Sequence, residues 1–173
     1  LEIGAIGGKD SMSGTFMDLT VPPTLVSFAA VTAPVKNIVS QDLKGPNHRL
    51  VYFDVPRTYN DTPDWDHFKE NCDILQEEIE KGRIYSAYVV DQGGIPEAVS
   101  KMALGNKIGV KFDKYAERAI FQPAIGSFIV EVDITAVNHL LELSDVRVIA
   151  VTQDTPVIEW NGQSVTLDEV EKA

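Results

Sequence analysis

Two glycine pairs in this chain carry residue types that could bind a phosphate. The first pair lies in residues 6–14, IGGKDSMSG, which contain Gly7, Gly8, Lys9, Asp10, Ser11 and Ser13. A lysine could neutralise a phosphate, a carboxylate could hold Mg²⁺, and serine hydroxyls could donate to either. The stretch is not a Walker loop, because Ile3 and Asp10 stand where that pattern needs glycine and Ser or Thr. A ligand-binding loop and an ordinary polar turn both remain open.

The second pair, Gly93 and Gly94, stands between an expected strand and an expected helix. A glycine turn at a helix start leaves backbone N–H groups free and pointing outward, where the helix dipole adds partial positive charge. The missing Cβ atoms would allow an anion to approach closely, or would simply allow a tight turn. The spacing does not match G-x-G-x-x-G, so it favours neither interpretation.

The other reactive side chains favour structural roles. Asp61, Asp64 and Asp66 could form a carboxylate pair, but a loop that runs into a helix cap is the favoured interpretation. Cys72 falls with Phe68, Leu75 and Ile79 on one apolar helix stripe, so we expect a buried core residue rather than a nucleophile. The three histidines have no ligand spacing, which argues against a zinc site. No residue is singled out as catalytic.

The composition excludes several classes of partner. The chain has 173 residues, 44% of them hydrophobic, which is enough for a buried core. Fifteen basic and 26 acidic residues give a net charge of −11, which disfavours nucleic acid and anionic membranes. No apolar run approaches the roughly 20 residues of a membrane helix. The chain starts without Met and within a motif, so we expect it to be a segment of a longer protein.

The pattern of elements predicts two parts. Residues 24–32 are expected to form a buried strand between prolines, and a boundary near residues 33–41 would separate residues 1–35 from residues 36–173. The expected strands downstream are 48–55, 84–90, 107–112, 127–133 and 145–153. The expected helices are 62–82, capped by Asp64 or Asp66 and ended by Gly82; 93–106, with Gly105 after its last turn; 135–143; and a short one after 167.

Alternating strands and helices predict an α/β or α+β layered sandwich with a mixed sheet in residues 36–173. The strand at 84–90 is expected to be buried on both sides because of its composition. Asn161 and Gly162 predict a type I′ hairpin between two further strands.

Four stretches together resemble one enzyme family. IGGKDSMSGTF with DLTVPPTLVSFA, then GPNHRLVYFD, VVDQGGIPEAVSKMALGNKIGV and GSFIVEVD resemble phosphoribosylformylglycinamidine synthases, of the aminoimidazole-ribonucleotide-synthetase superfamily. The resemblance implies that residues 1–35 close the nucleotide-binding half of the second synthetase repeat, and that residues 36–173 form the α/β C-terminal domain.

The resemblance also implies a function. The family amidates formylglycinamide ribonucleotide with ATP and glutamine in purine biosynthesis, so a cytoplasmic ATP-dependent carbon–nitrogen ligase is implied. ATP or ADP, Mg²⁺, small-molecule nucleotide substrates and a glutaminase domain would be its cofactors and partners. Gly7, Gly8, Lys9, Asp10, Ser11, Ser13, Gly93 and Gly94 would bind the nucleotide or its phosphates, and Asp10 would hold the metal. The isolated chain is expected to be inactive.

One departure from the family keeps alternatives open. Several relatives carry D-x-S-D-G-G before the helix, where the first Asp helps to bind Mg²⁺, but here that position is Val89. A non-catalytic, nucleotide-storing or structural half of the same enzyme is therefore one alternative. Another superfamily member, such as a selenophosphate- or thiamine-phosphate-handling enzyme, is the other.

Overall fold

The computed structural model describes residues 4–11, 13–113 and 118–172. The chain divides into two compact units, Leu1–Val35 and Lys36–Ala173, here called the first and second unit. Each unit is described by itself. The assignment of the first unit to a preceding nucleotide-binding domain stays a prediction.

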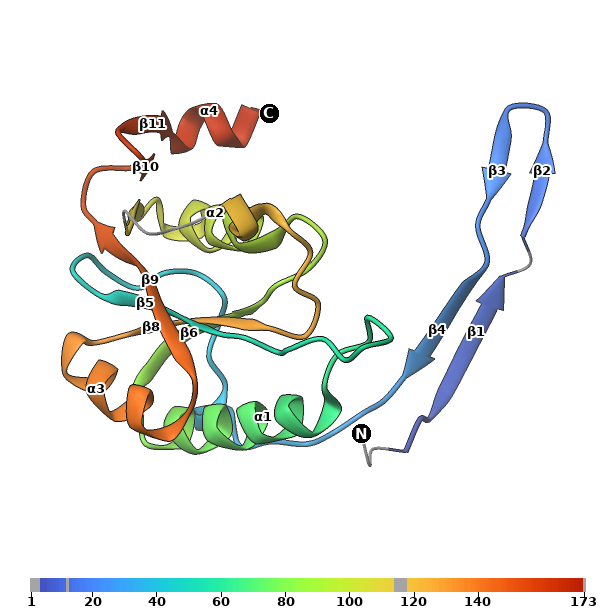
Figure 1. Cartoon of the computed structure of the whole chain (residues 1–173), viewed down its shortest axis with the longest axis horizontal. Helices are drawn as coiled ribbons and strands as arrows, with labels where there is room; N and C mark the ends of the chain where they lie inside the picture. Colours follow the sequence, from blue (N-terminus) through green and yellow to red (C-terminus); the bar gives the residue numbers. More distant parts are fainter. Residues whose placement is uncertain (1–3, 12, 114–117, 173) are drawn as a thin grey trace. The chain divides into compact units, whose positions relative to one another are not determined.

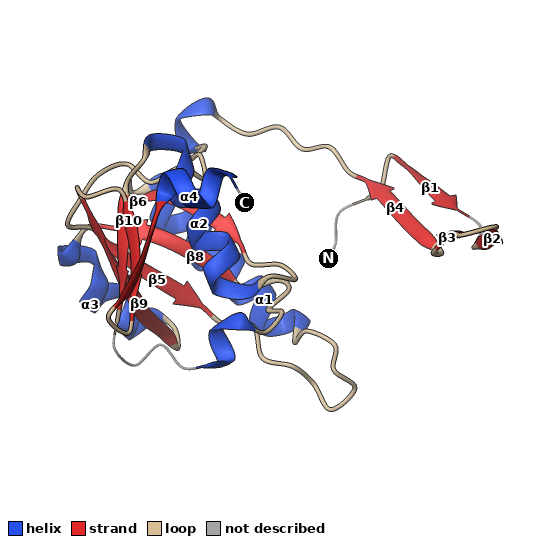
Figure 2. Cartoon of the chain, turned by 90° about the horizontal axis from the view of Figure 1, so that it is seen from above, coloured by secondary structure: helices blue, strands red, loops and turns tan. Residues whose placement is uncertain are grey.

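The described part of the first unit consists of strands joined by short turns. They are β1 (Gly7–Ser11), β2 (Gly14–Phe16), β3 (Leu19–Val21) and β4 (Thr24–Phe28). β1 pairs antiparallel with β4, and β2 pairs antiparallel with β3 (Figures 1 and 2). The expectation of a loop at GGKDS is therefore wrong, because strand pairing satisfies its backbone.

The expected buried strand at residues 24–32 is also corrected. β4 ends at Phe28, and all five of its residues are exposed. Leu25 is 85% exposed and Phe28 53%. An apolar run predicts burial only where a second layer covers it, and the described first unit contains no helix that could do so.

The second unit is built on a seven-stranded mixed sheet. Its strands are β5 (Arg49–Phe53), β6 (Ile84–Val89), β7 (Gly109–Phe112), β8 (Phe128–Val132), β9 (Val146–Gln153), β10 (Val157–Trp160) and β11 (Gln163–Thr166). Their order across the sheet is β11-β10-β7-β9-β5-β8-β6. β10 runs parallel to β7, and the other neighbours are antiparallel. The mixed sheet predicted from the sequence is confirmed.

Helices cover both faces of this sheet. They are α1 (Trp65–Glu80), α2 (Gly94–Asn106), α3 (Ile134–Leu143) and the short α4 (Leu167–Lys172), with 3₁₀ turns η1 (Val35–Asn37) and η2 (Arg118–Phe121). Figure 1 shows α2 over one face of the sheet and α1 and α3 over the other. The layered α/β sandwich predicted from the alternation of elements is confirmed.

Strand β5 illustrates why two apolar cores form. Leu50 and Tyr52 belong to the core beneath α2, whereas Val51 and Phe53 belong to the core with α1 and α3. Successive strand side chains point to opposite faces, so a strand covered on both sides must be apolar throughout. Burial of these side chains is the main force that holds the second unit together.

The predicted ends of α1 are confirmed. Asp64 is the N-cap, and its carboxylate accepts from the N–H groups of Asp66 and His67, each at 3.1 Å. Gly82, with φ of +70°, follows the last turn. The aspartates of this stretch therefore end a loop and cap a helix, as expected.

Cys72 was expected in the core but is only half-buried. The buried residues of α1 are Asn71, Leu75 and Glu78. Burial raises the pKa of the Cys72 thiol, so the thiol stays protonated near neutral pH. The buried face of α1 includes Glu78, whose carboxylate accepts from Arg83 at 2.5 and 2.8 Å, so the buried charge is paired.

Two further expectations need correction, and one is confirmed. Gly105 lies inside α2, and the helix instead ends at Lys107 with φ of +55°. β6, which lies at the edge of the sheet, is only partly buried: two of its six residues are buried, and Val89 is 51% exposed. Asn161 and Gly162 both have positive φ between the paired strands β10 and β11, as a type I′ hairpin requires.

Candidate functional site

The carboxyl ends of β5 and β6 meet at one edge of the sheet. Both strands pair antiparallel with β8, which lies between them, so they run in the same direction. Asp54 follows β5, and Asp91 with the second glycine pair follows β6. Ligands often bind beyond the carboxyl ends of such strands, so this edge is the candidate site of the second unit.

Asp54 is held by an internal hydrogen-bond network. Its carboxylate accepts from the Tyr52 hydroxyl at 2.9 Å and from Ser127 Oγ at 3.4 Å. Its carbonyl accepts from the Asn71 amide at 2.9 Å. Burial, and then the charge and hydrogen bond of Asp54, raise the pKa of Tyr52 to about 12 against the lowering effect of Ser127, so Tyr52 stays a neutral donor. These contacts fix the start of the loop after β5.

A hollow of about 530 Å³ lies over the end of β6. Its lining includes Gln41, Val89, Asp91 and Ile125. Val89 cannot ligate a metal, and Asp91 is the single carboxylate among the lining residues, all of which are described. The hollow therefore has room for a ligand but not a metal-binding set of its own side chains.

The backbone N–H groups of the second glycine pair are not free. The Gly93 N–H donates to Glu97 Oε2 at 2.7 Å, and the Gly94 N–H donates to the Asp91 carbonyl at 3.1 Å. The prediction of outward, unpaired N–H groups is therefore wrong. The helix caps itself with its own first-turn carboxylate, which favours the positive end of the dipole as an anion would.

Glu97 is itself held in place by a cation. Its carboxylate accepts from Lys101 Nζ at 2.5 Å, one helical turn away. This hydrogen bond, and then the one from the Gly93 N–H, lowers the pKa of Glu97. A phosphate at this helix start would have to displace an ionised side chain with two partners.

Close backbone packing explains why residue 94 is a glycine. Its φ is +70°, and a Cβ there would lie 2.7 Å from the Gln122 carbonyl oxygen and closer still to that of Ile120. Only glycine fits such a conformation beside another backbone segment. Gly94 thus brings α2 against η2, and an anion role for Gly93 and Gly94 stays a prediction.

Strand pairing gives a similar explanation for one glycine of the first pair. A Cβ at Gly8 would lie 2.9 Å from the Val26 carbonyl oxygen of β4, whereas one at Gly7 would meet nothing within 4 Å. The close approach at Gly8 is to the paired strand, so it needs no ligand to explain it.

The remaining predicted residues of the first unit follow strand geometry. Side chains alternate along β1, so Lys9 and Asp10 point to opposite faces of the strand. Both are exposed, and Lys9 Nζ donates to the backbone carbonyl of Asp10. Ser13 is exposed beyond the strand, and the side chain of Ser11 lies outside the described residues. Lys9 therefore cannot bind a phosphate on the same face of β1 on which Asp10 binds a metal ion.

Residues 4–11, 13–113 and 118–172 contain no group of three or more His, Cys, Asp or Glu side chains that could hold a metal ion. Asp10 as a metal ligand therefore stays a prediction, and its other ligands would have to come from elsewhere. In the described part of the chain, no helix is long and apolar enough to cross a membrane.

Sequence reasoning missed the most heavily hydrogen-bonded carboxylate of the second unit. Glu131 is fully buried in β8 and accepts from the Lys44 N–H at 2.8 Å, His48 Nδ1 at 2.7 Å and Ser86 Oγ at 2.8 Å. It fixes the segment that leads into β5. The signal in the sequence was a single acidic residue inside the otherwise apolar run SFIVEV.

Comparison with known proteins shows the fold. No family model and no curated protein matches the sequence. The structure of PurLQS from Thermotoga maritima is similar with a TM-score of 0.69 and 15% identity, over 83% of this chain and 28% of that one. Thermotoga maritima PurL complexed with ATP is similar with a TM-score of 0.65 and 16% identity, over 86% of this chain and 28% of that one. Escherichia coli HypE, a hydrogenase maturation protein, is similar with a TM-score of 0.60 and 12% identity, over 84% of this chain and 56% of that one.

These similarities show the fold of the chain and do not by themselves show its function. The chain shares its α/β fold with the PurL and HypE structures. It spans 28% of the length of the PurL structures. Function must be argued from residues rather than from fold.

Proposed function

We propose that the chain is a segment of an ATP-dependent carbon–nitrogen ligase of the phosphoribosylformylglycinamidine synthase family, with glutamine as amide donor. The observation that carries the proposal is the shared fold with PurL, a protein whose solved complexes contain ATP, ADP or AMPPCP. The KDSMS motif and its flanking residues support this family over the HypE-like alternative, which also shares the fold. Remaining domains with a glutaminase, and a cytoplasmic location, belong to the same proposal.

In this proposal the first unit ends the nucleotide-binding domain. Lys9 would neutralise nucleotide phosphates from one face of β1. Asp10 would hold Mg²⁺ from the opposite face, together with ligands from the rest of the enzyme. The exposed apolar side chains of β4, such as Leu25 and Phe28, would pack against the remainder of that domain, since such residues are costly to leave in water.

The proposed reaction needs little covalent chemistry from the protein. An amide oxygen is a poor leaving group, so ATP phosphorylates it and ammonia then displaces the phosphate. Such a step depends on positioning and on neutralising the developing charge. This agrees with the residues present: an exposed lysine, no activated thiol at Cys72, and carboxylates engaged in internal hydrogen bonds.

A second candidate is favoured by two observations at the end of β6. Val89 stands where several relatives have a metal-binding aspartate, and Glu97 occupies the N–H group that would face an anion. Both support a half of the enzyme that stores a nucleotide or has a structural role, rather than one that turns substrate over.

One substitution distinguishes the two candidates. In the full-length enzyme that the proposal implies, Lys9→Ala should remove a charge-assisted contact and weaken the affected step about tenfold or more. A catalytic half predicts loss of amidine formation, whereas a storage half predicts loss of co-purifying nucleotide with turnover largely kept. The matched control is Lys36→Ala, at another exposed lysine outside the motif. Unchanged turnover and unchanged nucleotide content in Lys9→Ala would contradict both.

A further inference from the structure

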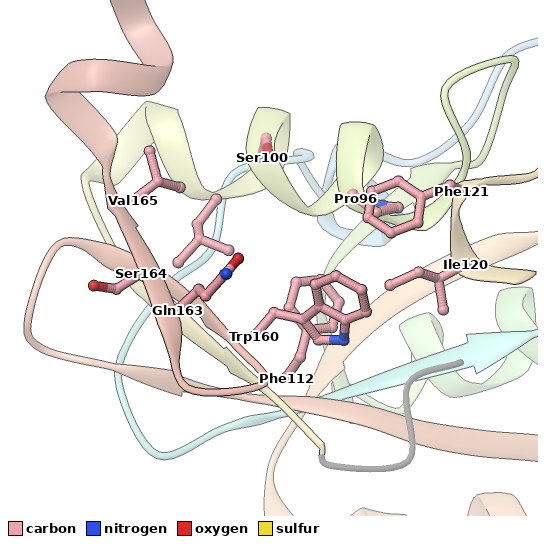
Figure 3. Close-up of a pocket in the computed structure, with 10 residues that line it drawn as sticks. Pro96, Ser100, Phe112, Ile120, Phe121, Trp160, Gln163, Ser164 and Val165 are labelled. Atoms are coloured by element: carbon pink, nitrogen blue, oxygen red, sulfur yellow. The ribbon is translucent and has the colours of Figure 1, made fainter. Parts of the chain in front are cut away.

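A second hollow in the second unit lies away from the carboxyl edge of β5 and β6. It has a volume of about 260 Å³ and is bounded by α2, η2, β7 and the β10–β11 hairpin. Figure 3 shows Phe121 and Ile120 on one side, Gln163 and Val165 on the other, Ser100 on the helix, and Trp160 between the two sides. Residues 96–112 and 120–121 thus converge on one pocket with the β10–β11 hairpin, which is distant from them in sequence.

Aromatic rings form part of its wall. Phe121 and Trp160 lie edge to face, with ring centroids 5.4 Å apart and planes at 69°. Phe112 is almost fully buried beside them. Phe121, in contrast, is 50% exposed, so a large apolar ring faces solvent at the mouth of the pocket. A flat ring inserted here would cover apolar surface that is now in water.

The polar groups of the wall are neutral. They include the hydroxyl of Ser100 and the amide of Gln163, and none of the ten lining residues, all of them described, carries an ionisable side chain. The chain as a whole has a net charge of −11. None of the described lining residues compensates a phosphate or carboxylate, so this part of the wall disfavours anions.

We propose that this pocket binds an uncharged planar heteroaromatic ring of about the size of a nucleobase. Aromatic walls with a few hydroxyl and amide groups suit a ring whose edge carries hydrogen-bond donors and acceptors. The volume of about 260 Å³ lies below the roughly 300–1,000 Å³ usual for ligand pockets, which fits a base or nucleoside better than a nucleotide. The inference does not rest on the proposed ligase function, because no residue of β1 takes part.

The experiment uses adenosine as the probe and the fluorescence of Trp160 as the signal. The chain has two tryptophans, so Trp65→Phe leaves Trp160 as the single reporter. Adenosine should change this fluorescence saturably, and calorimetry should give the same dissociation constant. AMP should bind no more tightly than adenosine, because the described lining residues include no cation.

Two variants test the location. Phe121→Ala, at a half-exposed ring, should weaken adenosine binding at least about fivefold, since stacking of a base on an aromatic side chain contributes that much or more. Ser100→Phe should fill the pocket and abolish binding, and Tyr59→Ala, at a 97% exposed ring elsewhere, is the control. Circular dichroism verifies that each variant is folded. Absence of saturable binding, full binding in Ser100→Phe, or much tighter binding of AMP would each overturn the proposal.

Discussion

The two glycine pairs read alike in the sequence but differ in the structure. Gly7 and Gly8 lie in an exposed, extended strand, and one of them is crowded by the paired strand. Gly93 and Gly94 start a helix in a packed unit, and Gly94 is buried with positive φ against a second backbone segment. The first pair stands beside an exposed lysine, whereas the second is capped by a carboxylate.

The comparison teaches that a glycine pair alone does not identify an anion site. The informative observations are which group accepts the hydrogen bond of each glycine N–H, and which atoms surround the position where a Cβ would lie. By these criteria neighbouring backbone explains both Gly8 and Gly94. We propose the first pair as the better candidate for contact with phosphate because it stands beside the exposed Lys9 and carries no capping carboxylate. The following predictions test that distinction.

The largest effect is expected at Gly94. Gly94→Ala should lower the free energy of unfolding of the second unit by about 3 kcal/mol or more, because positive φ and backbone overlap both oppose a Cβ. Gly82→Ala is the matched control, since Gly82 has the same φ of +70° but nothing within 4 Å of its Cβ position. It should cost only about 1 kcal/mol. Urea denaturation measures both, and equal losses would refute the role of close packing.

A smaller effect is expected at Gly8. Gly8→Ala should weaken the β1–β4 pairing by about 1 kcal/mol, because the new methyl group would crowd the Val26 carbonyl oxygen. Gly7→Ala, which meets nothing within 4 Å, should leave the pairing intact. Hydrogen exchange of the β1 amides reports this locally. Faster exchange in Gly7→Ala than in Gly8→Ala would show that the pairing is not what selects glycine.

The capping carboxylate predicts a pH dependence. The pKa of Glu97 is lowered in the folded state by Lys101 and then by the Gly93 N–H. Its contribution to stability is therefore fully present above the unfolded pKa and is lost as pH falls through the folded value. NMR titration should place the Glu97 pKa below its usual range, and Lys101→Met should raise it. A normal Glu97 pKa in the unchanged chain would mean that the cap does not persist in solution.

The smallest effect is expected from removing most of the first unit. Deletion of residues 1–20 should leave a cooperative thermal transition with Tm within about 4 °C, because the apolar cores lie in Lys36–Ala173. Scanning calorimetry of both chains makes the measurement. Loss of the transition would show that the second unit does not fold by its own core.

Local patterns predicted most of the fold of the second unit. The Asp64 cap, the Asn161-Gly162 turn and the apolar strands depend on neighbours in sequence, so they could be read directly. The half-burial of β6 could not, because its place at the sheet edge is set by pairing with the distant β8.

The candidate site was less accessible to sequence reasoning. The side chain of Glu97 reaches back to Gly93, and the η2 backbone approaches Gly94 from more than twenty positions away. Because of the first contact the Gly93 N–H is not free, and because of the second an anion cannot approach the Cα of Gly94 closely, although the sequence predicted both. The fully buried Glu131 was missed because its donors come from two segments distant in sequence, the one that leads into β5 and strand β6.

A crystal structure of the full-length protein, which we propose to be a ligase, with ADP and Mg²⁺ tests the central claim most directly. The account predicts a phosphate oxygen within hydrogen-bonding distance of Lys9 Nζ, on the face of β1 opposite Asp10, and Glu97 still bound to the Gly93 N–H. A nucleotide whose phosphates lie against Gly93 and Gly94 with Glu97 displaced, and with Lys9 free in solvent, would contradict it.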